Sequence, residues 1–118
     1  MINLSKIEQE LISEIGLSAL QAKVFLLVTC TGKMSPEIIS DKLNISNSNA
    51  LKTSQELMKL GAFIDISPTE FEAMHPRFTA VNMYRRRCQR ENIEFKQNKT
   101  VDNIGVVLEK QYDDARTK

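Results

Sequence analysis

Apolar residues recur at helical spacing through the first third of the chain and predict two helices there. Between residues 4 and 15 the apolar positions lie three or four residues apart with glutamates between them, and Gly16 then provides a stop. Ser18 and Gln21 fit a capping box, and the apolar run after them predicts a second, largely buried helix that ends near Gly32. The chain therefore opens with two helices separated by a short turn.

Two more helices are predicted next, with a short turn between them. Ser35 followed by proline is a helix start, because the hydroxyl caps the helix and proline at its first position loses no hydrogen bond. That helix is expected over residues 36–43. Asn44 tolerates a left-handed turn and Ser46 can cap the next helix, which is expected over residues 47–60.

The predicted helix over residues 47–60 is amphipathic. Its expected buried face holds Ala50, Leu51, Ser54, Leu57 and Met58. Its expected outward face holds Asn47, Ser48, Asn49, Lys52, Thr53, Gln55, Glu56 and Lys59. The outward face is therefore polar and rich in amides.

A β-hairpin is predicted after Gly61. Residues 62–66 alternate in polarity and are rich in β-forming side chains, and residues 67–70 mark a turn. Residues 77–81 are expected to form the returning strand. Helical spacing resumes at Asn82.

The C-terminal third is predicted to be helical and to contain a break. Apolar residues lie three or four apart from Val101 to Tyr112, whereas the segment around Asn98 is polar and Thr100 can cap a second helix. Gly105 lowers helix propensity by about 1 kcal/mol relative to alanine. We expect the break near Asn98.

The order of these elements predicts a mainly helical α+β fold. Three helices, the last two joined by a tight turn, and then a β-hairpin make a winged helix-turn-helix, here extended by a C-terminal helix or helices. The expected organisation is a winged helix-turn-helix domain over residues 1–81 and a helical dimerisation segment over residues 82–118.

The overall composition does not by itself indicate a nucleic-acid-binding protein. The 118 residues, 42% of them hydrophobic, suit one domain with its own core, and the net charge is only +1. Residues 1–81 carry seven basic and nine acidic side chains, whereas residues 82–118 carry nine basic and six acidic ones. The basic excess therefore lies in the C-terminal third.

The sequence offers no catalytic or cofactor-binding motif. The single histidine, His75, has no nucleophile or carboxylate pair at motif spacing, which is typical of a structural histidine in a turn. Cys30 and Cys88 match neither a redox motif nor a zinc-ligand spacing. A glycine-rich phosphate loop is also missing. We expect a protein that is not an enzyme and needs no cofactor or metal.

The predicted location is the cytoplasm. No apolar run approaches the ~18 residues that span a bilayer, and the start of the chain lacks the basic and apolar segments of a secretory signal. We therefore expect no membrane partner and two free thiols.

Four segments resemble the N-terminal domain of archaeal TrmB-type transcriptional regulators. They are Leu17–Phe25, Ser35–Ser40, Leu57–Ala62 and Phe78–Val81, and the resemblance covers about residues 10–95. It implies a winged helix that binds operator DNA as a dimer, with the helices after the wing forming the dimer contact.

Three features depart from that family's pattern. The helix start that usually carries a basic residue has Asn47–Asn49, and the predicted hairpin carries Asp65, Glu70 and Glu72, which would repel phosphates. The chain also leaves no room for the sugar-binding effector domain of larger members. We therefore expect no small-molecule effector.

The candidate reading face for duplex DNA lies at the start of the fourth predicted helix. Asn47 and Asn49 would hydrogen-bond to adenine edges, and Lys52 would reach a phosphate or a base one turn further on. The alternative is a capped helix start that merely faces water. The candidate DNA-binding residues are Ser46, Asn47, Ser48, Asn49, Lys52, Thr53, Arg77, Arg86 and Arg90.

The sequence leaves two interpretations of the arginines after residue 84, and two of the apolar face formed by Val101, Ile104, Leu108 and Tyr112, which we call the C-terminal stripe. Arg86 and Arg90 share a helix face and would contact the DNA backbone, or else pair with Glu91 and Glu94. The C-terminal stripe would pack either on a second copy of the chain, which we favour, or on its own domain. The candidate dimerisation residues are Leu4, Ile7, Leu11, Val101, Ile104, Leu108 and Tyr112.

The function predicted from these features is that of a homodimeric transcriptional regulator reading duplex DNA. The competing interpretation is a winged helix that serves as a protein-interaction module in a transcription or chromatin assembly, which the acidic hairpin would suit.

Overall fold

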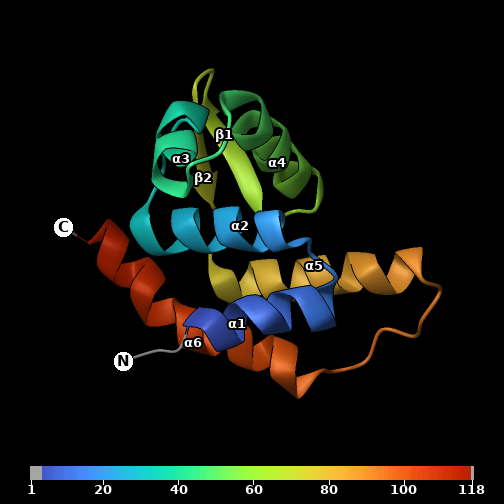
Figure 1. Cartoon of the computed structure of the whole chain (residues 1–118). Coiled ribbons are helices and arrows are strands. Elements are labelled where there is room, and N and C mark those ends of the chain that lie inside the picture. The colour runs from blue at the N-terminus through green and yellow to red at the C-terminus, as the bar shows by residue number, and fades with distance from the viewer. Residues whose placement is uncertain (1–3, 118) are drawn as a thin grey trace.

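The computed structural model describes residues 4–117, which form a mainly helical structure with one small antiparallel sheet (Figure 1). The elements in chain order are α1 (Leu4–Glu10), η1 (Leu11–Ile15), α2 (Ala19–Thr31), α3 (Pro36–Leu43), α4 (Asn47–Lys59), β1 (Phe63–Ser67), β2 (Glu70–Ala73), α5 (Pro76–Arg90) and α6 (Lys99–Arg116). The segment η1 is a π-helical continuation of α1. The predicted mainly α, α+β class is confirmed.

The helix boundaries predicted in the first half of the chain are confirmed by the caps. Ser18 accepts the Gln21 backbone N–H, and the Gln21 side chain accepts the Ser18 N–H, which completes the capping box. Ser35 and Ser46 cap α3 and α4 in the same way through their hydroxyls. Asn44 has the left-handed conformation expected of the residue that ends α3.

The returning strand lies earlier in the chain than predicted. β2 pairs with β1 after a loop of only Pro68 and Thr69, so the prediction of a strand over residues 77–81 is wrong. Those residues belong to α5, which begins at Pro76 and not at Asn82. The His75 ring accepts the Arg77 backbone N–H, and this cap together with proline at the first position starts a helix despite the β-forming side chains that follow.

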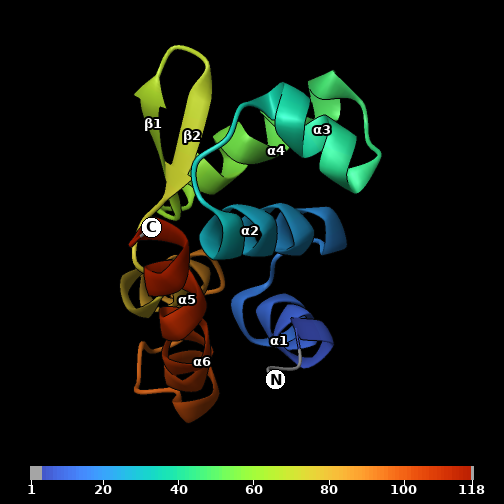
Figure 2. The ribbon, with the colours of Figure 1, turned by 90° about the vertical axis from the view of Figure 1, so that its left-hand side faces the viewer.

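The helices form two layers on either side of α2. α3, α4 and the hairpin lie on one side of α2, and α1, α5 and α6 lie on the other (Figures 1 and 2). Met34, just before α3, forms an isolated bridge with Phe71 of β2. This bridge ties the α3–α4 pair to the hairpin.

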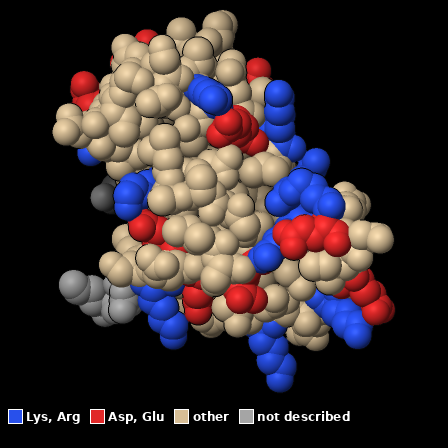
Figure 3. All heavy atoms as spheres, turned by 45° about the vertical axis from the view of Figure 1, so that its right-hand side comes forward, with Lys and Arg blue, Asp and Glu red and all other residues tan. Residues whose placement is uncertain are grey.

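The surface carries both signs of charge. In Figure 3 basic and acidic side chains are interspersed, and neither forms a continuous patch on the face shown. The arrangement agrees with the net charge of +1.

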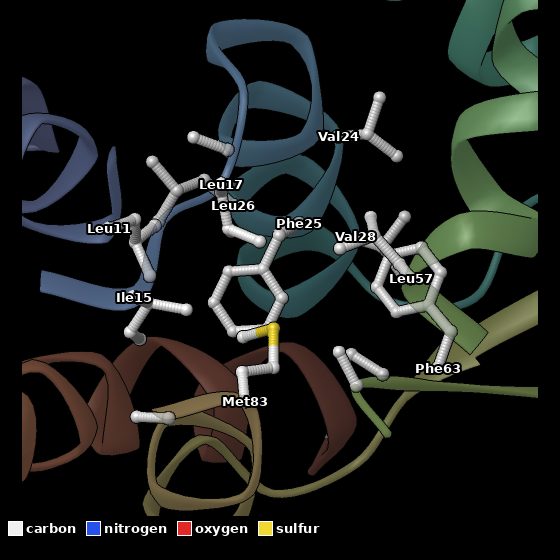
Figure 4. Close-up of a cluster of buried hydrophobic side chains, with 14 of the residues drawn as sticks. Leu11, Ile15, Leu17, Val24, Phe25, Leu26, Val28, Leu57, Phe63 and Met83 are labelled. Carbon is white, nitrogen blue, oxygen red and sulfur yellow. The ribbon is translucent and has the colours of Figure 1, made fainter. Parts of the chain in front are cut away.

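One hydrophobic core runs through both layers. In Figure 4 Phe25 of α2 lies near Met83 of α5, and Val28 lies near Leu57 and Phe63 of the other layer. The core also includes side chains from α1, η1 and α6. The predicted boundary between the domain and the C-terminal segment, at residues 81 and 82, falls inside α5, and side chains of α5 and α6 belong to the same core as those of the first 81 residues.

Most of the candidate dimerisation residues are core residues of the chain itself. Five of them are at most 3% exposed: Ile7, Leu11, Val101, Ile104 and Leu108. They cover the apolar sides of α2 and α5, which is the intrachain packing considered as the alternative. The expectation that these five contact a second copy is corrected, whereas Leu4 is exposed and Tyr112 is half-buried.

The predicted break near Asn98 separates α5 from α6. Asn98, and not Thr100, is the cap of α6, because its side-chain oxygen accepts the backbone N–H groups of Thr100 and Val101. Gly105 is buried where α6 crosses the start of α5. A Cβ atom at this position would lie 2.8 Å from the Arg77 Cα, so the missing side chain permits the close approach of the two helices.

Candidate nucleic-acid interface

The start of α4 presents a group of polar side chains that the protein itself does not use. Asn47, Ser48, Asn49 and Lys52 are all exposed, and within residues 4–117 their side chains have no hydrogen bond or ion pair. The Ser46 hydroxyl caps the helix by accepting the Asn49 N–H at 3.1 Å. A capped helix end therefore carries amide, hydroxyl and ammonium groups that are free to bind a ligand.

The predicted faces of α4 require two corrections. Thr53 is only 4% exposed and belongs to the buried side, so it cannot contact DNA in this fold. Leu51 and Met58, which were expected to be buried, are 42% and 36% exposed. Successive residues are about 100° apart on a helix, and the buried row of Ala50, Thr53 and Leu57 leaves Leu51 on the flank.

A shallow hollow separates the first turns of α4 from the hairpin. One part, of about 310 Å³, is lined by Asn47, Ser48 and Leu51 of α4 and by Pro68 and Thr69 of the hairpin loop. An adjoining part of about 190 Å³ continues along α4 past Gln55 and Met58. The start of α4 and the hairpin tip lie on the same side of the molecule, away from α5 and α6 (Figures 1 and 2).

The hairpin contributes negative charge to this side. Asp65 is exposed and lines the hollow, and Glu70 is half-buried at the start of β2. Glu72 is occupied, because it pairs with Arg116 of α6. Asp65 and Glu70 would repel a phosphate brought to the hairpin, so contacts made by α4 must dominate any binding of DNA.

The arginines proposed as backbone contacts lie apart from the start of α4. α5, which carries them, lies on the opposite side of α2 from the hairpin tip (Figures 1 and 2). Arg77 lies 3.7 Å from Glu109 of α6, Arg86 lies beside Gly61 just after α4, and Arg90 lies beside the turn before α2. The structure therefore does not bring Arg77, Arg86 and Arg90 together with the α4 residues.

Another arginine of α5, Arg87, connects this helix to η1. Its Nη1 donates to the carbonyl oxygens of Ser13 and Glu14, each at 2.7 Å, and its Nε donates to Glu91 at the same distance. The hydrogen bond to Glu91 raises the pKa of Arg87 above its ordinary value. The sequence analysis considered an ion pair of Arg86 or Arg90 with Glu91 or Glu94. The structure contains such a pair, but it joins Arg87 to Glu91.

A group of potential metal ligands joins α5 to α6. The His75 Nε2 lies 3.4 Å from Glu109 and 3.9 Å from Asp113, and the ligand atoms of all three residues lie within 4.8 Å of one another. The Nδ1 atom accepts the Arg77 N–H at 3.2 Å, which places the proton of the neutral ring on Nε2, facing the carboxylates. If Nε2 bound a metal, the neutral ring would carry its proton on Nδ1, and Nδ1 could no longer accept the Arg77 N–H that caps α5. The three side chains are therefore better suited to holding α5 against α6 than to binding a metal.

Arg116 fastens the end of α6 to the other layer. Its guanidinium donates to the carbonyl oxygens of Val28 and Thr29, pairs with Glu72 of β2 and lies 3.7 Å from the centre of the Tyr112 ring. Arg116 therefore connects α2, the hairpin and α6 through one side chain.

Neither thiol is placed for ready reaction. Burial raises the pKa of the Cys30 thiol, and the nearby Arg116 lowers it by a smaller amount. Cys88 is only 2% exposed. Both cysteines are free, as predicted.

Replacement of Arg116 by alanine should lower the free energy of unfolding by about 1–2 kcal/mol, because it removes the ion pair with Glu72 and the hydrogen bond to the partly buried Thr29 carbonyl oxygen, whereas Val28 keeps its hydrogen bond from the Gly32 N–H. Urea denaturation measures the change. Lys110→Ala is the control, since it removes an exposed ion pair with Asp114 on the same helix and should cost about 0.5 kcal/mol or less. Equal losses in the two variants would contradict the assigned role of Arg116.

Two exposed residues of α4 were not among the sequence candidates. Gln55 was assigned to the outward face without a role, and Leu51 was assigned to the core because it is apolar. The sequence did contain a signal for the exposure of Leu51. It follows Ala50 directly, and successive helix residues are about 100° apart, so Leu51 lies to one side of the buried row that holds Ala50 and Leu57.

Comparison of the chain with protein-family models, curated proteins and solved structures gives no match. The resemblance to the TrmB-type domain therefore remains a prediction that rests on the four segments quoted for it. Within the part of the chain that the structure describes, no helix is long and apolar enough to cross a membrane.

Proposed function

We infer that the protein is a winged-helix DNA-binding protein that acts as a transcriptional regulator, with α4 entering the major groove of duplex DNA. The observation that carries this inference is the exposed start of α4, where Asn47, Ser48 and Lys52 have no partner within residues 4–117. A helix fits the major groove, and amide and ammonium side chains at its first turns reach base edges and phosphates there. The element order of α2, α3, α4 and hairpin agrees with this mode of docking.

The charge distribution limits the electrostatic part of the binding. Lys52 and Lys59 are the exposed basic side chains of α4, and the hairpin beside them is acidic. Each phosphate contact changes the slope of log affinity against log salt by about −0.9. We therefore expect a shallow salt dependence and binding that relies on base contacts.

Titration of the purified protein against a random duplex pool at two salt concentrations tests the proposal. We expect a recovered consensus sequence, and Lys52→Ala should weaken binding to all sequences and reduce the salt slope by about one. Lys110→Ala is the matched control, because it removes an exposed lysine from α6, on the other side of the molecule. The absence of binding to any duplex at low salt would refute the proposal.

The second candidate function is a protein-interaction module. Leu51 and Met58 are exposed along a hollow that Pro36 and Pro68 also line, and such a surface accepts an apolar segment of another protein. A protein that binds no duplex, remains folded and loses a protein partner on Met58→Ser would favour this function.

The oligomeric state is a separate question. A dimer formed by the folded chain would have to use exposed side chains, because most of the C-terminal stripe is already buried. The molecular mass of the protein and of its complex with DNA, measured in solution during the titration, shows whether one copy or two bind a palindromic site.

A further inference from the structure

Three side chains follow one another along the side of α4 that faces the hairpin. Asn47, Leu51 and Gln55 are spaced four residues apart, so they lie on successive turns of one helix face. All three are exposed and line the hollow beside the hairpin. We call them the amide–leucine row.

The row combines two kinds of chemistry. Within residues 4–117 neither amide side chain has a hydrogen-bond partner, so both retain their donor and acceptor. Between them, Leu51 is 42% exposed, so a ligand that covered this apolar side chain would gain binding free energy by removing it from water. A ligand that satisfies the whole row must offer a paired donor and acceptor and, beside them, an apolar group.

In duplex DNA an A·T pair has this combination at its major-groove edge. Adenine presents the N7 acceptor beside the N6 donor, which an asparagine or glutamine amide can bind in a bidentate manner, and thymine presents its C5 methyl group. A G·C pair offers no methyl group, and its purine presents two acceptors. The row is about 12 Å long, which corresponds to about 3.5 base-pair steps.

We propose that the amide–leucine row makes α4 a reader of consecutive A·T pairs, in which Asn47 and Gln55 bind adenine edges and Leu51 contacts a thymine methyl group. This inference rests on the proposed function, since it names the bases that the same helix selects. Ser48, which also lines the hollow, and the exposed Lys52 then contact the DNA without choosing between A·T and G·C pairs.

The test begins with the duplex recovered from the random pool and replaces each of its thymines by uracil, one at a time. Uracil lacks only the C5 methyl group, so wild-type protein should lose about fourfold in affinity at the contacted position, the value of one buried methyl-sized group. Leu51→Ala should bind the thymine and uracil duplexes with equal affinity. The matched control is Met58→Ala, which shortens another exposed apolar side chain near the hollow and should keep the fourfold difference.

The amides are tested with 7-deazaadenine, which lacks the N7 acceptor. Wild-type protein should lose at least about fivefold at an adenine bound by Gln55, and Gln55→Ala should remove that difference. Thermal unfolding of each variant verifies that the exposed substitutions leave the fold intact.

The outcomes separate the two proposals. If no duplex binds at low salt, DNA binding itself fails. If a duplex binds but the consensus is rich in G·C pairs, or if no uracil substitution weakens binding, DNA binding stands and the assignment of the row is wrong. A uracil effect that persists in Leu51→Ala also overturns the role of Leu51.

Discussion

Replacement of Ile104 by alanine is expected to lower the free energy of unfolding by about 2–5 kcal/mol, the largest effect predicted for this chain. Ile104 is 0% exposed, because α6 packs against α5, α2 and η1 around it. The shorter side chain would leave a cavity that these helices cannot fully close. Urea denaturation followed by circular dichroism measures the loss.

The same experiment distinguishes intrachain packing from dimerisation. The loss should be independent of protein concentration, because the contacts of Ile104 lie within one chain. Val106→Ala is the control: Val106 is 52% exposed on the same helix, and the change should cost less than about 0.5 kcal/mol. A midpoint that shifts strongly with concentration in wild-type protein would show that association contributes to stability after all.

The second large effect is expected from Gly105→Ala. Alanine favours a helix over glycine by about 1 kcal/mol, and in an exposed helix the change would stabilise the protein. Here the new Cβ atom would lie 2.8 Å from the Arg77 Cα and 3.1 Å from the Pro76 carbonyl oxygen, both of them backbone atoms that cannot rotate away. Overpacking of this kind costs about 1–3 kcal/mol, so we expect a net loss of about 1–2 kcal/mol.

Asn103→Ala provides the comparison for Gly105→Ala. Asn103 is exposed in the same turn of α6, so its replacement keeps the gain in helix propensity without the steric conflict. We expect a small increase in the melting temperature for Asn103→Ala and a decrease for Gly105→Ala. An increase in both would mean that α6 can move away from α5 at little cost.

Much of the fold follows from local signals in the sequence. Ser18, Ser35 and Ser46 mark helix starts because each hydroxyl satisfies a backbone N–H that the helix leaves free, and this chemistry does not depend on distant residues. The break before α6 was predictable for a similar reason, since Asn98 lies in a polar segment and caps the helix. The parts of the fold that caps determine were therefore predicted.

The errors concern segments whose structure depends on packing. Phe78, Thr79 and Val81 favour strands by composition, but Thr79 is buried in a helix that packs against α6. The destination of the C-terminal stripe was equally undetermined, because an apolar face has the same pattern whether it covers its own domain or a second copy. Only the three-dimensional arrangement assigns Val101 and Leu108 to the chain's own core.

The candidate site was predicted in part. Asn47, Ser48, Asn49 and Lys52 lie exposed at the start of α4 as expected, because a capped polar helix start remains at the surface. Their binding of DNA stays a prediction. Thr53 is buried and Leu51 is exposed, which is the reverse of the prediction. The side of α4 that is buried depends on the position of α2 and not on hydrophobicity alone.

The contribution of α6 to the core has a consequence for how the protein is made. The ribosome releases α1, η1 and α2 well before α6, and until α6 arrives the apolar sides of η1 and α2 that it covers face solvent. Arg87 must also find the carbonyl oxygens of Ser13 and Glu14, more than 70 residues earlier in the chain. The core therefore cannot close before α6 has left the ribosome, and until then the nascent chain exposes a surface of the kind that chaperones bind.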